Sequence, residues 1–178
     1  TDPPAISIIL ETPTDITCNG DGNGTITIIA SGGTGVLEDS ITGFAYQSGG
    51  TPFTGLSAGS YTVTVRDANG CMQTGSTLTI NEPAAITITL LDSTDVTTCG
   101  GSDGTITITA TGGTGTLNYS IDGGTTYPNT TGIFTGLAVG NYAIAVQDSN
   151  GCILIGSTIT INDLGTIIIN PDPVVFTD

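Results

Sequence analysis

Residues 55–71 read GLSAGSYTVTVRDANGC, and residues 136–152 read GLAVGNYAIAVQDSNGC. In the first stretch threonine alternates with Tyr61, Val63 and Val65, a period of two that predicts a half-buried β-strand. The Asn-Gly pair that follows favours a tight turn, because glycine adopts positive φ at little cost. The second stretch lies 81 positions after the first (136 − 55), so the chain is a tandem repeat of one β-rich unit.

Alternating runs of β-branched residues recur along the whole chain and indicate an all-β fold. Threonine maintains a high β-propensity on the wet face of a strand, while isoleucine or valine faces the core. Glycine pairs separate the runs, and no segment shows a convincing helical period. We therefore expect two tandem immunoglobulin-like β-sandwich domains, each with about six or seven short strands. The further alternating runs are residues 25–28, 86–90, 105–109 and 158–161.

The repeat also predicts the domain boundaries. The segment 82–86, Glu-Pro-Ala-Ala-Ile, opens a second unit as 2–6, Asp-Pro-Pro-Ala-Ile, opens the first, which gives domains at 1–82 and 83–163. A third copy starts and leaves only residues 164–178, an extra C-terminal strand with no domain of its own to pack on. Its apolar side chains need a partner, and we expect an adjacent subunit to provide one. The expected donor residues are Thr166, Ile167, Ile168, Ile169, Val174, Val175 and Phe176.

The four cysteines follow the repeat. Cys18 and Cys71 are 53 positions apart, as are Cys99 and Cys152 (71 − 18 and 152 − 99). The chain has no histidine and no Cys-x-x-Cys motif, so disulfides are favoured over a zinc site. Four cysteines allow three pairings, and the repeat favours Cys18 with Cys71 and Cys99 with Cys152, because each small domain then carries its own bridge. Disulfides in turn predict an oxidising compartment.

Charge and residue content argue against several classes of function. Arg66 is the only Lys or Arg against 16 Asp and Glu, and the net charge of −15 disfavours nucleic acids and anionic membranes as partners. No run of about 20 apolar residues is present, so we expect no membrane insertion. Without His or Lys the serines and threonines lack a usual general base, and we expect no enzyme. A chain that starts at Thr1 without a signal peptide fits a processed, exported protein.

The run from Gly55 to Cys71 resembles the SprB repeat of bacterial gliding-motility adhesins, together with Cys18, residues 21–26 and the Gly-Gly-Thr-Gly of 32–35. The second unit shows the same pattern through Cys99, residues 103–106, 112–115 and 136–152. The resemblance implies a secreted, cell-surface, immunoglobulin-like module used in tandem copies. One departure concerns the aromatic-rich strand that usually follows the glycine turn, which is replaced here by residues 36–41 and 117–121.

Oxygen-rich turns raise the possibility of calcium binding. Asp21, Asp67 and Asp148 each open a turn that contains asparagine and glycine, and alternating oxygen ligands followed by glycine resemble the start of a calcium loop. The alternative is that these side chains cap their own turns, which we favour because no bidentate glutamate follows. A cation at Glu82 or Asp163 is a variant of the same idea. We expect no other cofactor and no metal site.

Short motifs also suggest glycosylation. Three asparagines lie in Asn-x-Ser/Thr sequons, and two serines lie in Asp-Ser-apolar or Asp-Ser-Thr motifs that resemble bacterial O-glycosylation sites. The candidates are Asn23, Asn118, Asn129, Ser40 and Ser93.

Two functions fit these observations. The first is a structural subunit of an extracellular filament, assembled head to tail from copies of itself by donation of the C-terminal strand. An alternative donor is the N-terminal strand with Ile6, Ile8 and Leu10. The second function is a stalk fragment of a multi-repeat surface adhesin, with recognition in loops such as 43–52 and 122–132, which differ between the units.

Overall fold

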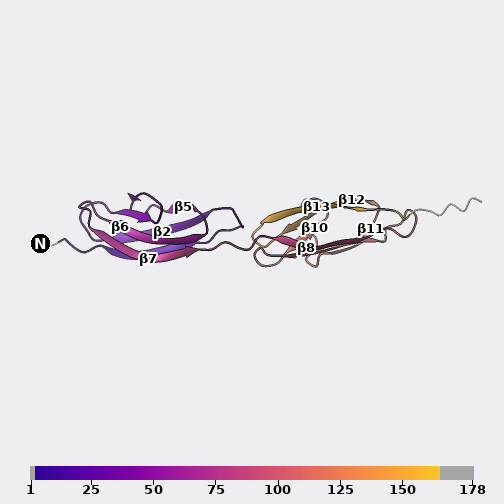
Figure 1. Ribbon diagram of the computed structural model, residues 1–178, viewed down its shortest axis with the longest axis horizontal. Coiled ribbons are helices and arrows are strands. Elements are labelled where there is room, and N and C mark those ends of the chain that lie inside the picture. Colours follow the sequence, from indigo (N-terminus) through magenta and orange to yellow (C-terminus); the bar gives the residue numbers. More distant parts are fainter. Residues whose placement is uncertain (1–2, 165–178) are drawn as a thin grey trace, which may run out of the picture. The chain divides into compact units, whose positions relative to one another are not determined.

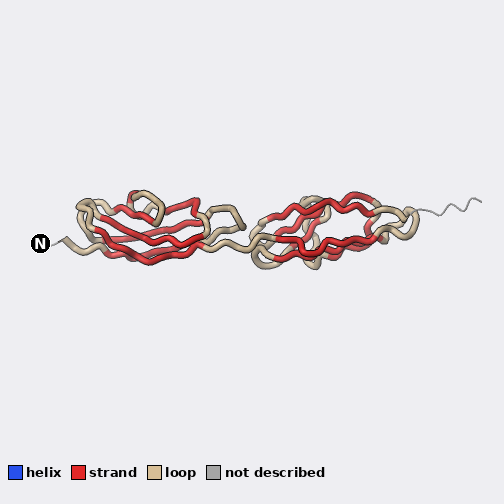
Figure 2. Tube along the Cα trace, in the orientation of Figure 1, coloured by secondary structure: helices blue, strands red, loops and turns tan. Residues whose placement is uncertain are grey.

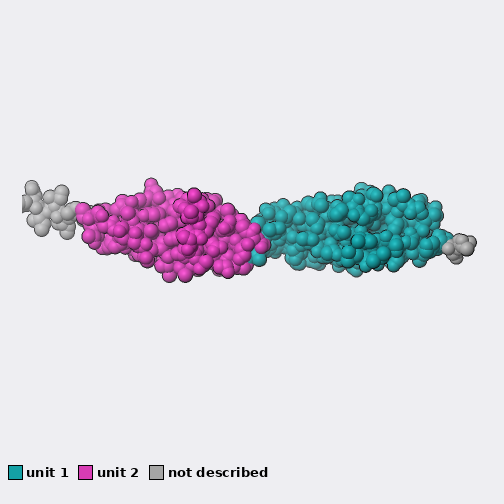
Figure 3. All heavy atoms as spheres, turned by 180° about the vertical axis from the view of Figure 1, so that it is seen from behind, with its two compact units in different colours: residues 1–85, 112–114 teal, residues 86–111, 115–178 magenta. Residues whose placement is uncertain are grey.

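The computed structural model describes residues 3–164, and every regular element in that range is a β-strand. The strands fall into two compact units, residues 1–85 with 112–114 and residues 86–111 with 115–178 (Figure 1, Figure 3). Figure 2 shows the two sets of strands joined by loops, with no helix among the described residues.

Unit 1 is a sandwich of two antiparallel sheets. One sheet has the order β1-β2-β5 and the other the order β4-β3-β6-β7. The Thr-Val alternation of residues 61–65 lies in β6, which pairs with β7 from Gly59↔Ile80 at one end to Arg66↔Met72 at the other. The strands are β1 (Ser7–Thr14), β2 (Gly24–Ser31), β3 (Glu38–Ile41), β4 (Gln47–Ser48), β5 (Phe53–Leu56), β6 (Gly59–Arg66) and β7 (Met72–Ile80).

Unit 2 repeats this architecture with sheets β11-β9-β8 and β10-β12-β13, and its described strands include no counterpart of β4. The irregularity of the β1–β2 pairing between Ile8 and Leu10 recurs between Ile88 and Leu90, so even the local bulge of the first strand is repeated. The strands are β8 (Thr87–Thr94), β9 (Gly104–Thr111), β10 (Asn118–Ser120), β11 (Ile133–Leu137), β12 (Gly140–Gln147) and β13 (Ile153–Ile161).

Each unit has its own hydrophobic core between its sheets. Ile26 and Ile28 of β2 face Val63 and Val65 of β6 in a single buried cluster, while the intervening threonines lie nearer the surface. In unit 2 the corresponding cluster includes Ile106, Ile108, Ile144 and Val146. The all-β, immunoglobulin-like sandwich expected from the sequence is confirmed. The expected extra C-terminal strand lies outside the described residues.

Candidate functional site: the two ends of each sandwich

We call the end at which the chain enters a unit its leading end, and the end at which it leaves its trailing end. In unit 1 the leading end is held by hydrogen bonds from Gly33 N–H to the carbonyl of Pro4 (2.8 Å) and from Ala68 N–H to the carbonyl of Thr34 (3.0 Å). The hairpin turn between β6 and β7, which contains Asp67 and Cys71, lies at this end. The leading end therefore combines the incoming chain with two turns.

The trailing end of unit 1 lies at the other end of the β6–β7 ladder. Ile16 N–H donates to the carbonyl of Asn81 (2.9 Å), and the backbone N–H of Gly20 donates to Oε2 of Glu82 (3.0 Å). Both bonds fix the loop of residues 15–23, which contains Cys18, against the outgoing chain. Cys18 and Cys71 therefore lie at opposite ends of the same sandwich.

Unit 2 has the same two ends. At its leading end the β12–β13 turn bears Cys152, and Thr116 N–H donates to Ser149 Oγ (2.9 Å). At its trailing end Val96 N–H donates to the carbonyl of Asn162 (2.9 Å) and Gly100 N–H donates to Oδ2 of Asp163 (3.3 Å).

The trailing-end loop of unit 2, residues 95–103, contains Cys99. Asp163 thus accepts a hydrogen bond from a loop N–H, as Glu82 does in unit 1. Among residues 3–164 neither acid belongs to a group of three potential metal ligands.

The expected pairing of cysteines within each repeat is wrong. An eight-residue strand such as β6 or β12 spans about 25 Å, whereas the Cα atoms of a disulfide lie no more than about 7 Å apart. Cys71 is a free, exposed thiol. Cys18 and Cys152 are disulfide-bonded, as expected for these two residues, but the other cysteine of each unit is out of reach.

Two aspartates of the oxygen-rich turns cap their own turns. Oδ1 of Asp67 accepts the N–H groups of Asn69 (3.0 Å) and Cys71 (2.9 Å), and its Oδ2 accepts that of Thr34 (2.9 Å). The hydrogen bond from Thr34, with those from Cys71 and Asn69, lowers the pKa of Asp67. Oδ1 of Asp148 accepts the equivalent N–H groups of Asn150 and Cys152, both at 2.9 Å.

The third candidate calcium residue, Asp21, lies elsewhere. It is exposed in the trailing-end loop of unit 1, where its N–H donates to the carbonyl of Cys18 (3.1 Å). The three aspartates therefore do not converge on a common point, because Asp67 lies at the opposite end of that unit.

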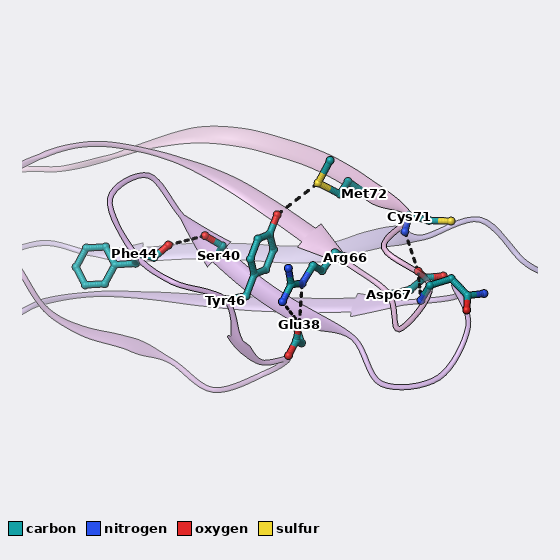
Figure 4. A network of polar contacts seen from close by, with 9 residues as sticks. Glu38, Ser40, Phe44, Tyr46, Arg66, Asp67, Cys71 and Met72 are labelled. Atoms are coloured by element: carbon teal, nitrogen blue, oxygen red, sulfur yellow. Dashed lines mark hydrogen bonds and ion pairs between the residues drawn. The ribbon is translucent and has the colours of Figure 1, made fainter.

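The only cation of the chain lies in a cluster that sequence reasoning missed. Arg66 Nε donates to Oε2 of Glu38 (2.6 Å), its guanidinium lies 3.9 Å from the ring centroid of Tyr46, and Tyr46 Oη donates to Sδ of Met72 (3.6 Å) (Figure 4). Because Arg66 and Glu38 are each about 40% exposed, the ion pair contributes little stability, about 0–1 kcal/mol.

This cluster borders an open hollow at the leading end of unit 1. The hollow has a volume of about 490 Å³ and is lined by Val36, Glu38 and Arg66 together with residues 67–70. In unit 2 the cross-strand partners that correspond to Glu38 and Arg66 are Asn118 and Gln147. Glu38 and Arg66 thus give unit 1 a charged surface that unit 2 lacks at the corresponding positions. The signal that could have revealed this cluster was the pairing of residues 38 and 66 across β3 and β6.

A second hollow, of about 320 Å³, lies beside Asp39 and the turn of Gly49 and Gly50. Asp39 is only 1% exposed, its Oδ2 accepts the N–H of Gly50 (2.8 Å), and its Oδ1 has no hydrogen-bond partner. Burial raises the pKa of this carboxyl group, and the hydrogen bond from Gly50 offsets part of the effect.

The candidate donor strands differ in what the structure describes. The C-terminal residues 166–169 and 174–176 lie outside the described range. The alternative N-terminal strand is paired with β2, and Ile6 and Ile8 pack on the core of unit 1, while Leu10 remains 45% exposed. Donation of this strand to another copy would therefore require its displacement from its own sheet.

The glycosylation candidates vary in exposure. Asn23 is exposed, while Asn118, Ser40 and Ser93 are half-buried. Asn129 is also half-buried, and both ends of its amide are engaged: Oδ1 accepts the N–H groups of Thr131 and Gly132, and Nδ2 donates to the carbonyl of Ile133.

The fold and the matched ends of its two sandwiches define a tandem immunoglobulin-like repeat module. The SprB repeat family model matches the chain twice, at residues 10–36 and 90–126, which confirms the resemblance drawn from the sequence. Both matches cover most of the first strand pair of a unit and the turn after it, and the second match extends past β10. A comparison with curated proteins finds no match.

Two solved structures have a chain trace that is similar to part of this one. One is the C-terminal 282-residue fragment of intimin in complex with the intimin-binding domain of the translocated intimin receptor (15% identity, TM-score 0.44, 88% of this chain and 64% of that chain). The other is the N-terminal eight Ig domains of Down syndrome cell adhesion molecule (16% identity, TM-score 0.46, 92% of this chain and 25% of that chain). The chain spans less than two thirds of the length of either.

Proposed function

We propose that this chain is a structural subunit of a bacterial extracellular filament, in which copies join head to tail. The observation that carries the proposal is the placement of the chain within each sandwich: it enters at one end and leaves at the opposite end. Such a unit offers two different surfaces, and a repeated contact between different surfaces grows an open fibre unless its rotation closes a ring. The match to a repeat found in surface adhesins supports a location on the cell surface.

Strand donation is the joining mechanism that we favour. From the sequence, residues 166–169 supply an apolar strand, and an acceptor needs an open sheet edge with its own apolar side chains. Among the described strands β13 pairs only with β12, and its Ile153 and Ile155 are 51% and 64% exposed. The edge of β13 is therefore open to pairing with another strand.

The corresponding edge of unit 1 is protected. Oε1 of Glu11 accepts the N–H of Ser76 on β7 at 2.9 Å, so a backbone donor of this edge strand is already used. The register of the two units places Leu91 where unit 1 has Glu11, since these residues pair with Ile108 and Ile28 respectively. An uncharged residue at this position leaves β13 without the same protection.

The test compares the full chain with a version that ends at Asn162, by negative-stain electron microscopy and size-exclusion chromatography. Fibres from the full chain with monomers from the shortened chain are the expected result. Monomers from both would overturn the filament proposal. Fibres from both would assign the donor role to the N-terminal strand.

The second candidate function is a stalk fragment of a longer surface adhesin, and the tandem SprB matches favour it. Repeats of this kind then act as spacers within one chain rather than as separate subunits. Monomers from both versions in the same test are the result that this function predicts.

Neither function involves catalysis, an anionic membrane or nucleic acid. Among residues 3–164 the structure contains no helix long and apolar enough to cross a membrane. The disulfide-bonded cysteines support an oxidising, extracellular location.

A further inference from the structure

The cysteines form two structural classes, defined by the end of the sandwich on which they lie. Cys71 and Cys152 occupy equivalent positions in leading-end turns, because they are 81 residues apart (152 − 71) and follow the same Asp-x-Asn-Gly sequence. Cys18 and Cys99 occupy equivalent trailing-end loops, also 81 residues apart (99 − 18). Each unit thus has one cysteine at each end.

One member of each class is already oxidised. Cys152 at a leading end and Cys18 at a trailing end are disulfide-bonded, and both are half-buried. The other cysteine of each unit lies about 25 Å away along the sandwich, beyond the reach of a disulfide. A leading-end position and a trailing-end position of this repeat are thus both compatible with a disulfide.

The backbone presents Cys71 in the same way as the oxidised Cys152. Cys71 N–H donates to Oδ1 of Asp67 at 2.9 Å and the Asp67 N–H donates to the carbonyl of Cys71 at 3.0 Å. The two corresponding distances for Cys152 and Asp148 are also 2.9 and 3.0 Å. The hydrogen-bonded turn that holds the disulfide-bonded Cys152 in unit 2 is thus also present in unit 1, where the Cys71 thiol is free and exposed.

We propose that Cys71 forms an interchain disulfide with Cys99 of a second copy of this chain. Cys99 is exposed on the trailing end of unit 2 and belongs to the same class as the oxidised Cys18. Joining a leading end to a trailing end links copies head to tail. The inference rests on the proposed head-to-tail assembly and adds a covalent bond at each junction.

The chemistry is thiol–disulfide exchange with a low-molecular-weight or protein disulfide as the oxidant. The thiolate of Cys71 attacks this disulfide and forms a mixed disulfide, and the released sulfur leaves as a thiol after taking up a proton. The thiolate of Cys99 then attacks the Cys71 sulfur and displaces the second thiol. Two cysteine thiols are oxidised by two electrons, and the oxidant is reduced to two thiols.

The test uses complementary variants of the full chain, Cys71→Ser and Cys99→Ser, in an oxidised and reduced glutathione buffer. Neither exposed position has a core-packing role, so both variants should fold, which circular dichroism checks. On a non-reducing gel the unmodified chain should give a ladder of multimers. Each variant alone should give at least tenfold less multimer.

The decisive sample on the non-reducing gel is a mixture of the two variants. Cys99→Ser supplies only Cys71 and Cys71→Ser supplies only Cys99, so the mixture should form a dimer and nothing larger. Mass spectrometry of the dimer should find a peptide that joins residue 71 to residue 99. Dimers of one variant with itself, or the lack of the linked peptide, would overturn the proposal.

Electron microscopy of the same samples separates this proposal from the filament proposal. Fibres without the 71–99 peptide would reject the disulfide and leave the filament intact. The linked peptide without fibres would support the disulfide and count against the filament.

Discussion

Asp67 shows how a single carboxylate organises the leading end of unit 1. It accepts three backbone N–H groups from two different turns, the hairpin turn of residues 67–71 and the glycine turn that contains Thr34. Buried backbone donors that lose their acceptor incur a desolvation cost, so this side chain stabilises both turns together. Asp148 makes two of the same bonds in unit 2.

We expect Asp67→Ala to lower the melting temperature of unit 1 by about 5 °C, because three donors lose their acceptor. The folded pKa of Asp67 is lowered, so its contribution to the free energy of unfolding is present above pH 3.8 and is lost as the pH falls through the folded pKa. Thermal melts at pH 7 and at low pH should therefore show the difference between variant and wild type shrinking in acid. Asp148→Ala is the matched control, and its effect should be confined to unit 2. Equal melting temperatures of Asp67→Ala and the wild type at pH 7 would contradict the prediction.

A second prediction concerns Asp39, whose buried carboxylate has one oxygen without a partner. We expect Asp39→Asn to raise the melting temperature at pH 7 by about 3 °C, because the amide keeps the bond from Gly50 and removes a buried charge. A raised folded pKa means that the wild type gains stability as the pH falls through that pKa, and the gain is complete below 3.8. The difference between variant and wild type should therefore be largest at neutral pH, and a destabilised variant at pH 7 would contradict this reasoning.

At the scale of the elements, the two sandwiches differ at one sheet edge. Glu11 of β1 binds the edge strand β7, whereas in unit 2 the corresponding residue of β8 is Leu91, and the edge strand β13 exposes Ile153 and Ile155. Charged groups at edges suppress the pairing of a strand with another chain. The sequence difference between Glu11 and Leu91 thus gives one unit a protected edge and the other an open one.

We expect Glu11→Ala to open the edge of β7, because the Ser76 N–H loses its acceptor. Hydrogen exchange at residues 74–78 should become at least several-fold faster, since exposed amide groups open with little free energy. Leu91→Ala in unit 2 is the control and should leave exchange in β7 unchanged. Unaltered exchange in the Glu11→Ala variant would show that the carboxylate does not protect this edge.

At the scale of the whole molecule, each unit has a core of its own. The buried clusters around Ile28 and Ile108 are separate, and each consists of residues from a single repeat. Small β-sandwiches of this size bury a limited fraction of their surface, so single core residues carry much of their stability.

We expect Ile28→Ala to destabilise unit 1 by about 3 kcal/mol, because it removes a fully buried side chain and leaves a cavity. Ile108→Ala should do the same to unit 2. Hydrogen exchange followed by mass spectrometry, which resolves the two units in one experiment, should show faster exchange confined to the mutated unit. Equal acceleration in both units would contradict the presence of two separate cores.

The sequence by itself determined the strands, the repeat and the fold class. Alternation such as that of residues 61–65 has one physical meaning, a strand with one wet and one buried face, and glycine turns separate one strand from the next. The turn-capping role of Asp67 also followed from its place before Asn69 and Gly70, although its third bond, to Thr34, depends on a turn that is distant in sequence.

Only the tertiary structure decided where the cysteines lie and which surfaces carry charge. Equal spacing of Cys18–Cys71 and Cys99–Cys152 suggested a bridge within each repeat, but spacing does not say which end of a sandwich a turn occupies. That depends on the direction of every strand between the two cysteines, and a disulfide forms only where the Cα atoms approach within about 7 Å. Strand placement also explains the charged cluster. Arg66 and Glu38 lie together because β3 pairs with β6, and Tyr46 joins them because it directly precedes β4, which also pairs with β3.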